Sequence, residues 1–239
     1  MTICNVDFKS LEVVTAAWLS QDPVMMDEIK AGTDMHEANR LAFNLPSRLV
    51  AKVLKFRILY GGTAFSFAKD PDFTPVSKQV PFWENVIDKY YSKYRGLKQW
   101  HDQLIREATT KGMVQSPFGR IFKFERQQKW NGDMVWPVTD IKNYPVQGTG
   151  ADIVCMSRVM INKAFNRANL KSKLISTVHD SIVADAVPDE VDIVCKIFSE
   201  EIAKTPQYLT KYFDCDFNLP LVGEVSVGNN MLDLEEVEI

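Results

Sequence analysis

The sequence is poor in cysteine and has no long apolar stretch. Both features limit the classes of protein to which it can belong. Its 239 residues include four cysteines and no Cys-x-x-Cys pair, so we expect neither a disulfide framework nor a zinc site and favour a reducing cytoplasm. No apolar run reaches the roughly 18 residues of a transmembrane helix, and the opening residues MTICNVDFKS show no signal peptide. We therefore predict a cytoplasmic protein without a membrane partner.

Two familiar enzyme signatures are missing as well. There is no Gly-x-x-x-x-Gly-Lys-Ser/Thr loop, which excludes a P-loop ATPase. No serine lies in a Gly-x-Ser-x-Gly turn, so a serine hydrolase is poorly supported. The composition that is present, 46% hydrophobic and 25% charged, is typical of a globular chain that can bury a core.

Charge is distributed unevenly along the chain. The formal net charge is −3, yet six basic residues and no acid lie between Arg40 and Lys69, and five basic residues and no acid lie between Ile153 and His179. Such segregation suits a polyanionic partner, and an alternative is that these side chains only solvate helix faces. Composition alone leaves both interpretations open.

Turn residues and hydrophobic periodicity predict an α+β fold, in which a small antiparallel sheet carries a large helical insertion. Pro46 is expected at the first position of its helix, and Gly61-Gly62 is expected to end that helix. The predicted elements are a strand over 2–8, helices over 10–20, 34–43, 46–60, 75 or 81 to 96 and on to 111, two strands within 113–124, a helix over 146–168, a hairpin over 173–187, a helix over 188–204 and a strand within 219–228.

Asp7 and Asp180 are the first candidates for chemistry. Each lies at the end of a predicted strand in an otherwise apolar stretch, where a carboxylate is costly unless it is paired, and a divalent cation is the obvious partner. If the two strands are neighbours, the aspartates can hold two magnesium ions about 3.5–4 Å apart. The alternative, which either residue taken alone favours, is an aspartate that caps a turn.

Cations and aromatic rings share one face of the helix over 46–60. Two cations four residues apart can clamp a triphosphate, and a ring one turn further on can stack on a base or a sugar. The alternative is an amphipathic helix with extended cationic side chains. The residues of this face are Arg48, Lys52, Phe56 and Tyr60.

Two amides, Asn143 and Gln147, flank Pro145 at the entrance to the helix over 146–168. Asn and Gln can hydrogen-bond base edges in the minor groove of a duplex, although amides near helix starts are also common caps. Two of the three histidines have no clear role from their position alone: His36 lies on a short polar helix face, and His101 is expected at the surface.

Taken in their order along the chain, the segments that carry these candidate residues resemble the palm and fingers of family A DNA polymerases. The likeness runs from about Asp7 to Gly228, and it departs from the family where Ser181 replaces a glutamate. Further departures are Lys55 and Arg57 in place of Asn and Gly, and Thr139 in place of an arginine. The similar segments are Asp7-Phe8-Lys9-Ser10-Leu11-Glu12 for motif A, Arg48-x-x-x-Lys52-x-x-x-Phe56-x-x-x-Tyr60-Gly61 for motif B, Val178-His179-Asp180 for motif C, and the helix start Gln147-Gly148-Thr149-Gly150-Ala151-Asp152.

The resemblance implies template-directed DNA synthesis, in which a primer 3′-hydroxyl attacks the α-phosphate of a deoxynucleotide. Asp7 and Asp180, with the carbonyl of Phe8, would bind two Mg²⁺ ions, for which Mn²⁺ can substitute, and Lys52 would donate a proton to pyrophosphate. Glu12 would exclude a 2′-hydroxyl. The implied nucleotide-binding residues are Glu12, His36, Arg48, Lys52, Phe56 and Tyr60, and the implied primer–template residues are Tyr60, Gly61, Asn143, Gln147 and His179.

The same resemblance implies a palm over residues 1–31 and 137–239 and mainly fingers over residues 32–136, with thumb and exonuclease absent. We therefore expect a second polypeptide to supply the thumb and early palm, with an exonuclease as a further candidate, as in a split, phage-type polymerase that acts on primed DNA and dNTPs in the host cytoplasm. One alternative is a single-subunit RNA polymerase, against which Glu12 argues. Another is a non-catalytic DNA-binding assembly subunit, against which the paired aspartates argue.

Overall fold

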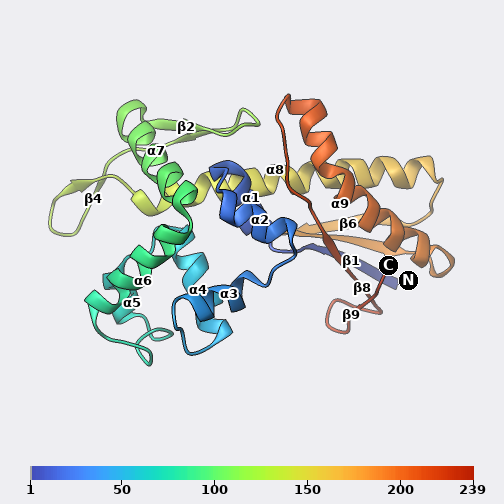
Figure 1. Cartoon of the computed structure of the whole chain (residues 1–239). Helices are drawn as coiled ribbons and strands as arrows, with labels where there is room; N and C mark the ends of the chain where they lie inside the picture. Colours follow the sequence, from blue (N-terminus) through green and yellow to red (C-terminus); the bar gives the residue numbers. More distant parts are fainter. Residues whose placement is uncertain (1) are drawn as a thin grey trace. The chain divides into compact units, whose positions relative to one another are not determined.

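The computed structural model describes residues 2–239, and the chain divides into two compact units. The sheet unit comprises Met1–Thr15 and Gly148–Ile239, and the helical unit comprises Ala16–Gln147. Across the described residues, no helix is both long and apolar enough to cross a membrane. The helices (Figure 1) are α1 (Leu11–Ser20), α2 (Pro23–Lys30), α3 (Met35–Ala42), α4 (Arg48–Leu59), α5 (Ala64–Lys69), α6 (Val80–Lys93), α7 (Arg95–Lys111), α8 (Val138–Arg167) and α9 (Val191–Phe213), with a 3₁₀ turn η1 (Pro188–Glu190).

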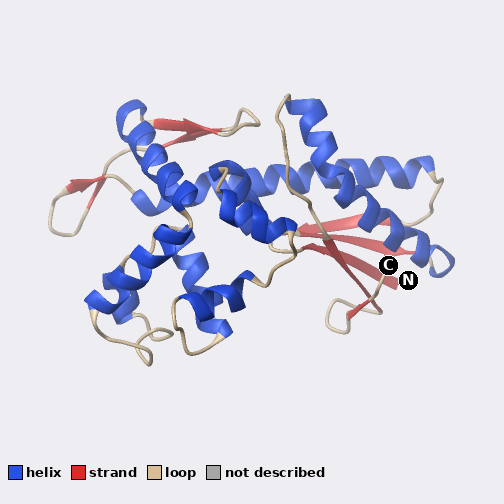
Figure 2. Cartoon of the chain, viewed as in Figure 1, coloured by secondary structure: helices blue, strands red, loops and turns tan. Residues whose placement is uncertain are grey.

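The sheet unit is built on an antiparallel sheet, drawn in red beside the chain ends in Figure 2. Its five strands have the order β6-β7-β1-β8-β9. Its central strand, β1, alternates in burial, so Cys4, Val6 and Phe8 lie in the core while Asp7 points to the open face. Helix α9 packs on β1 and β8. The strands of the chain are β1 (Thr2–Phe8), β2 (Met113–Gln115), β3 (Ile121–Lys123), β4 (Gln127–Gln128), β5 (Met134–Val135), β6 (Lys173–Val178), β7 (Ser181–Ala186), β8 (Gly223–Gly228) and β9 (Glu235–Glu236).

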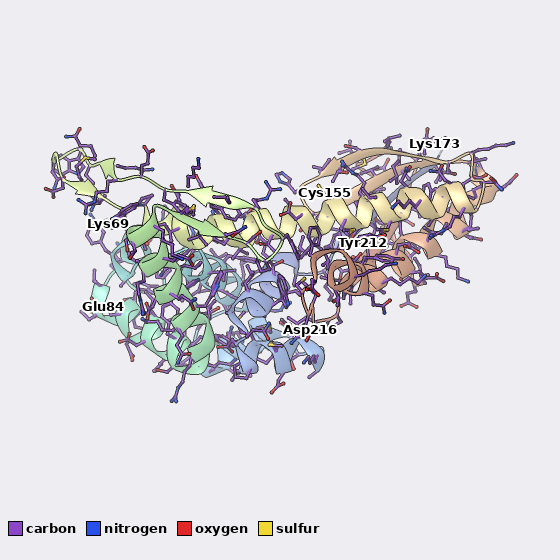
Figure 3. The ribbon with its side chains drawn as sticks, turned by 90° about the horizontal axis from the view of Figure 1, so that it is seen from above. Lys69, Glu84, Cys155, Lys173, Tyr212 and Asp216 are labelled. Carbon is purple, nitrogen blue, oxygen red and sulfur yellow. The ribbon has the colours of Figure 1, made fainter. Side chains whose placement is uncertain are left out.

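The sheet unit carries an exposed polar side chain on its outer strand and an exposed aromatic side chain near the end of α9. Lys173 begins the outer strand β6, Tyr212 lies near the end of α9, and both side chains are exposed (Figure 3). Within the described part of the chain, β6 pairs only with β7, so its other edge is open, and a charged residue at its start is typical of such an edge.

The helical unit has an aromatic core. Trp83 is fully buried, and its ring packs against the rings of Phe67 and Phe73 at centroid distances of 5.7 and 5.2 Å. Asp22 connects two helices of this unit, because its carboxylate accepts from the backbone N–H of Met25 at the start of α2 and from that of Leu97 in α7. These contacts give the unit a hydrophobic centre of its own.

The α+β class and the small antiparallel sheet are confirmed, but several predicted boundaries are wrong. Helix α4 begins at Arg48, not at Pro46, because Ser47 is its N-cap and the Ser47 hydroxyl accepts from the N–H of Val50. Helix α8 begins at Val138, eight residues earlier than predicted, and it runs through Pro145. Helix α9 likewise continues through Pro206 to Phe213.

Packing explains why two helices continue through a proline. It also explains why the predicted surface position of His101 is wrong. Ile141 and Val146, on either side of Pro145, are both fully buried, and their burial outweighs the one hydrogen bond that proline removes. His101, predicted at the surface, is fully buried in α7, with its Nδ1 3.1 Å from the hydroxyl of Tyr91.

Candidate functional site

In the sheet unit, Asp7 and Asp180 lie beside each other, as their strand positions predict. Asp7 is the penultimate residue of β1, and it pairs across the sheet with Ser181, the residue that follows Asp180. Because successive side chains of a strand alternate between faces, the buried Val6 and Phe8 direct Asp7 toward solvent. A ligand for an ion or a phosphate needs that open side.

The bend of the β6–β7 hairpin holds Asp180 in place. The backbone N–H of Phe8 donates to the carbonyl of Asp180 at 3.1 Å, which ties the end of β1 to the bend. The Ser181 hydroxyl donates to the carbonyl of Val178 at 3.0 Å and closes the turn. His179, at the corner, has a φ of 53°, a left-handed conformation that non-glycine residues adopt at a cost. These backbone contacts therefore fix the position of Asp180 beside the end of β1.

The two carboxylates repel each other. Desolvation, followed by the charge of Asp180 and, more weakly, that of Glu224, raises the pKa of Asp7 above its usual value. Glu224 pairs with Asp7 across β1 and β8, and its own carboxylate is 3.0 Å from the ammonium of Lys9. A cation between Asp7 and Asp180 would relieve their repulsion, so the site fits a divalent metal.

The number of side-chain ligands also suits magnesium. Nowhere in residues 2–239 do three or more histidine, cysteine, aspartate or glutamate side chains gather as a metal cage. Mg²⁺ is usually bound by one or two carboxylates, with waters and substrate phosphates in the remaining positions. Asp7 and Asp180 meet that description. Glu12, in the first turn of α1, is half-buried in the same unit.

The helical unit brings together the cationic end of α4 and the start of α3. The Asp34 carboxylate caps α3 by accepting from the N–H groups of His36 and Glu37, and it also accepts from the Arg48 guanidinium at 2.7 Å. That guanidinium lowers the pKa of Asp34 to about 2. Arg48 and Lys52 are exposed, as phosphate ligands must be.

His36 faces α4 across this junction. Its ring lies 6.4 Å from the ring of Phe56, and burial, followed by the charges of Lys55 and Arg48, lowers its pKa to about 4. Imidazole is therefore neutral at pH 7. The ring of Phe56 stacks on that of Tyr60 at 6.4 Å, so the aromatic half of the predicted face is continuous.

The end of α4 meets α8 within the helical unit. The Gln147 amide donates to the hydroxyl of Tyr60 at 3.0 Å. Gly61 has a φ of 82°, and a β-carbon there would lie 3.3 Å from both Lys142 Cδ and Thr139 Cα. Asn143, which lies four residues before Gln147 in α8, has a buried Oδ1 without a hydrogen-bond partner. Three of the residues predicted to contact primer and template, Tyr60, Gly61 and Gln147, thus lie close together.

The predicted site residues therefore fall into two groups, one in each unit. Asp7, Phe8 and Asp180 form the first, and His36, Arg48 and Phe56 anchor the second. Sequence reasoning missed the roles of Asp34 and Glu224 at these sites. The sequence signals for Asp34 are its place at the start of the predicted helix over 34–43 and the excess of cations after it. Glu224 becomes relevant only when the register of β8 against β1 is known.

The chain belongs to DNA polymerase family A, whose family model matches residues 1–233. It is 26% identical to DNA polymerase I of Chloroflexus aurantiacus, with 94% of this chain and 23% of the relative covered. For DNA polymerase I of Aquifex aeolicus, identity is 25%, with 86% and 36% covered. For the DNA polymerase of Bacillus phage SP01, it is 26%, with 99% and 26% covered.

The fold agrees with a solved polymerase domain. The structure of the POL domain of Pol1 from M. smegmatis, in complex with DNA primer-template and dNTP, superposes with a TM-score of 0.80 at 18% identity. The match covers 96% of this chain and 40% of that one. The chain thus spans between about a quarter and two fifths of the polymerases it resembles.

Proposed function

We propose that this chain carries out template-directed DNA synthesis, transferring a nucleotide from a dNTP to a primer 3′-hydroxyl. The observation that carries the proposal is the Asp7–Asp180 pair, held at the open face of the sheet by the Phe8–Asp180 backbone hydrogen bond. The pKa of Asp7 is raised beside Asp180, and a metal-dependent phosphoryl transfer needs two such neighbouring carboxylates.

In this proposal, Asp7 and Asp180, with the carbonyl of Phe8, hold two Mg²⁺ ions, for which Mn²⁺ can substitute. When bound, the ions lower the pKa of the attacking hydroxyl and stabilise charge on the leaving phosphate. The protein's own contribution is to fix the two carboxylates through the backbone of β1 and the hairpin bend. Glu12, one turn into α1, excludes a 2′-hydroxyl from the nucleotide sugar.

The helical unit binds the nucleotide in this proposal. Arg48 and Lys52 contact the triphosphate, and Lys52 gives a proton to the departing pyrophosphate. His36, neutral at pH 7, offers a hydrogen bond without an added charge. Phe56 packs on the sugar and Tyr60 stacks near the templating base. Primer and template are contacted by Tyr60, Gly61, Asn143, Gln147 and His179.

We assign residues 1–31 and 137–239 to the palm and residues 32–136 mainly to the fingers. The relatives extend well beyond the matched segment, and in this proposal a second polypeptide supplies a thumb and the early palm, with an exonuclease as a further candidate. The phage relative is consistent with a phage-type polymerase.

Primer extension with magnesium and dNTPs tests the proposal. Asp180→Asn should lower extension roughly 10²- to 10⁴-fold, because it removes a ligand worth several kcal/mol of charge stabilisation. Asp189→Asn, the same change at an exposed position of η1, is the matched control and should leave extension unchanged. Near-parental extension by Asp180→Asn would contradict the metal assignment.

A binding measurement separates the metal site from overall activity. Mg²⁺ or Mn²⁺ should raise the melting temperature of the parent and of Asp189→Asn, and should raise that of Asp180→Asn much less. This result does not require a thumb, so it stands even if extension needs a partner chain. Equal stabilisation of all three proteins would mean that the pair does not bind metal.

Two other functions make different predictions. A single-subunit RNA polymerase would extend primers with ribonucleotides, and Glu12→Ala should raise ribonucleotide incorporation if Glu12 excludes the 2′-hydroxyl. A non-catalytic assembly subunit would bind DNA without metal-dependent extension. The raised pKa of Asp7 beside Asp180 favours the enzyme over that subunit.

A further inference from the structure

A short two-stranded ribbon, β4 and β5, carries an exposed tryptophan at its tip. The strands pair through Gln127 with Val135 and Gln128 with Met134, and Trp130 lies in the connection. Figure 1 shows the ribbon as a loop that extends away from the helices of its unit. Its side chains add nothing to the core, because every residue from Glu125 to Met134 is exposed.

The base of the ribbon is anchored. Phe124, just before β4, is 5% exposed in a core cluster with Leu104, Ala108 and Ile141. Trp136, just after β5, packs against the same cluster, and the Arg126 guanidinium lies 5.9 Å from the centre of its ring. Two aromatic residues thus fix both ends of the ribbon.

The tip is a closed turn that holds Trp130 in solvent. The N–H of Gly132 donates to the carbonyl of Lys129 at 2.9 Å, and the N–H of Lys129 donates to the carbonyl of Asp133 at 2.8 Å. Gly132 has a φ of 87°, and the Asn131 amide donates to the Asp133 carboxylate at 2.7 Å. Trp130 is 99% exposed, so this ordered turn presents nearly all of a large aromatic surface to water.

The charge around the ribbon indicates what would cover that surface. Basic residues recur every three positions before the tryptophan, and all are exposed, in a chain whose net charge is −3. Glu125 lies among them, and Asp133, beyond the tryptophan, is the second acid between residues 120 and 135, against four basic residues. Regular cations beside an exposed ring match the combination by which proteins bind single-stranded nucleic acid, the cations contacting phosphates and the ring stacking on a base. The basic residues are Arg120, Lys123, Arg126 and Lys129.

We propose that the ribbon is a binding site for single-stranded DNA, in which Trp130 stacks on an unpaired base and Lys129 contacts the adjacent phosphate. The choice of DNA over other polyanions rests on the proposed function, whereas the stacking site rests on the ribbon itself. Burying the indole against a base removes apolar surface that the fold leaves in water, and the ordered turn reduces the entropy cost of binding.

Fluorescence anisotropy of labelled DNA tests the site in the full chain. The probes are a single strand, a primed duplex with a long 5′ template overhang, and a blunt duplex. Trp130→Ala should weaken binding to the single strand and the overhang by roughly five- to 150-fold, the range for one lost stacking contact, with little change on the blunt duplex. Trp130→Phe, which keeps a ring, should lie between parent and alanine variant.

Two further variants complete the design. Leu232→Ala changes a side chain that is 95% exposed in the sheet unit, and it should bind all three probes like the parent. Lys129→Gln should make the dependence of log K on log salt less steep by about 0.7 to 1, because it removes one phosphate contact. A salt dependence equal to that of the parent would overturn the phosphate contact.

Several outcomes would overturn the stacking site. They are no measurable binding of single strands by the parent, Trp130→Ala within twofold of the parent, a phenylalanine variant as weak as the alanine variant, or an equal loss on the blunt duplex. Capture of a protein partner that depends on Trp130, with DNA binding unchanged, would also overturn it. Asp180→Asn should bind all probes normally while failing to extend primers, so failure of the site and failure of the proposed function are distinguishable.

Discussion

At the scale of single residues, Lys55 is a charged group that is costly to bury in the helical unit. Its side chain lies in the interior of that unit, on α4, and is only 2% exposed. Burial is the main cause that lowers its pKa to about 8, opposed by the nearby carboxylates of Glu28 and Asp34. Below that pH the ammonium is charged in the folded protein, and folding must overcome its desolvation.

Replacing this lysine with methionine should stabilise the protein at neutral pH. The pKa of Lys55 is depressed in the folded state from 10.5 to about 8, so its cost is fully present below pH 8. At 1.36 kcal/mol per unit, Lys55→Met should gain about 1–3 kcal/mol at pH 7. Between pH 8 and 10.5 the unfolded parent binds more protons than the folded parent, so parental stability rises and the gain shrinks.

Urea unfolding of parent and variant at pH 7 and pH 10 measures this difference. Lys89→Met, at an exposed position of α6, is the control and should show no pH-dependent gain. A gain that is the same at both pH values would show that packing, not charge burial, explains the effect.

His36 should respond to the same substitution. Burial is the first cause of its lowered pKa of about 4, and the charge of Lys55 is the second. Lys55→Met should therefore raise the pKa of His36 toward its usual 6.5 without reaching it. An NMR titration of the imidazole protons checks this, with His36→Gln to assign the signal. A parental pKa near 6.5, or no change in the variant, would contradict the electrostatics of this junction.

These residues show what sequence can and cannot specify. Asp7 and Asp180 were predictable because a carboxylate in an apolar strand is unusual in itself. The burial of Lys55 and His101 was not, since helix periodicity gives the spacing of side chains but not which faces other helices cover. The pairing of Arg48 with Asp34 joins two separate helices, and no local pattern encodes it.

At the scale of elements, the connection between α4 and α5 depends on two adjacent glycines. A β-carbon at Gly62 would lie 2.7 Å from the carbonyl oxygen of Arg57 and 2.9 Å from the ring of Phe67. The backbone oxygen cannot move without disturbing the end of α4. Gly61, whose φ is 82°, ends this helix where the sequence predicts, because glycine adopts the left-handed conformation without strain.

Gly62→Ala should therefore destabilise the protein by about 1–3 kcal/mol, the usual cost of overpacking. Gly32→Ala is the matched control, because Gly32 has a φ of 65° but nothing within 4 Å of its added β-carbon. Its cost should stay near 1 kcal/mol, from backbone conformation alone. Thermal or urea unfolding measures both, and equal losses would show that the contacts at Gly62 relax freely.

The predicted boundaries of helices and strands are wrong where the sequence signal is weakest. The hairpins over 113–124 and 173–187 were predictable, since alternation and turn residues agree there. The two-residue strands β4, β5 and β9 are too short for any alternation to be visible. Pro145 and Pro206 suggested helix ends, but buried residues on both sides of each proline keep α8 and α9 continuous.

At the scale of the whole molecule, each compact unit has its own core. Phe198 is fully buried in the sheet unit and stacks on Phe165 at 5.9 Å, while Trp83 is fully buried in the helical unit. Among the helices and strands of residues 2–239, only α1 and α8 belong partly to both units. The sequence shows the motifs that each unit contains. It does not show where one unit ends and the other begins, because that division follows from packing.

Separate cores should produce separate responses to core substitutions. Phe198→Ala and Trp83→Ala should each cost about 3–5 kcal/mol, from lost burial and the cavity left behind. Hydrogen exchange should accelerate in the unit that holds the substitution and much less in the other, because local opening follows cooperative units. Within α8, the boundary should fall near Gly148, where the helical unit ends. Equal acceleration in both units after either substitution would mean that the chain unfolds as one body, and the two groups of site residues would then share one stability.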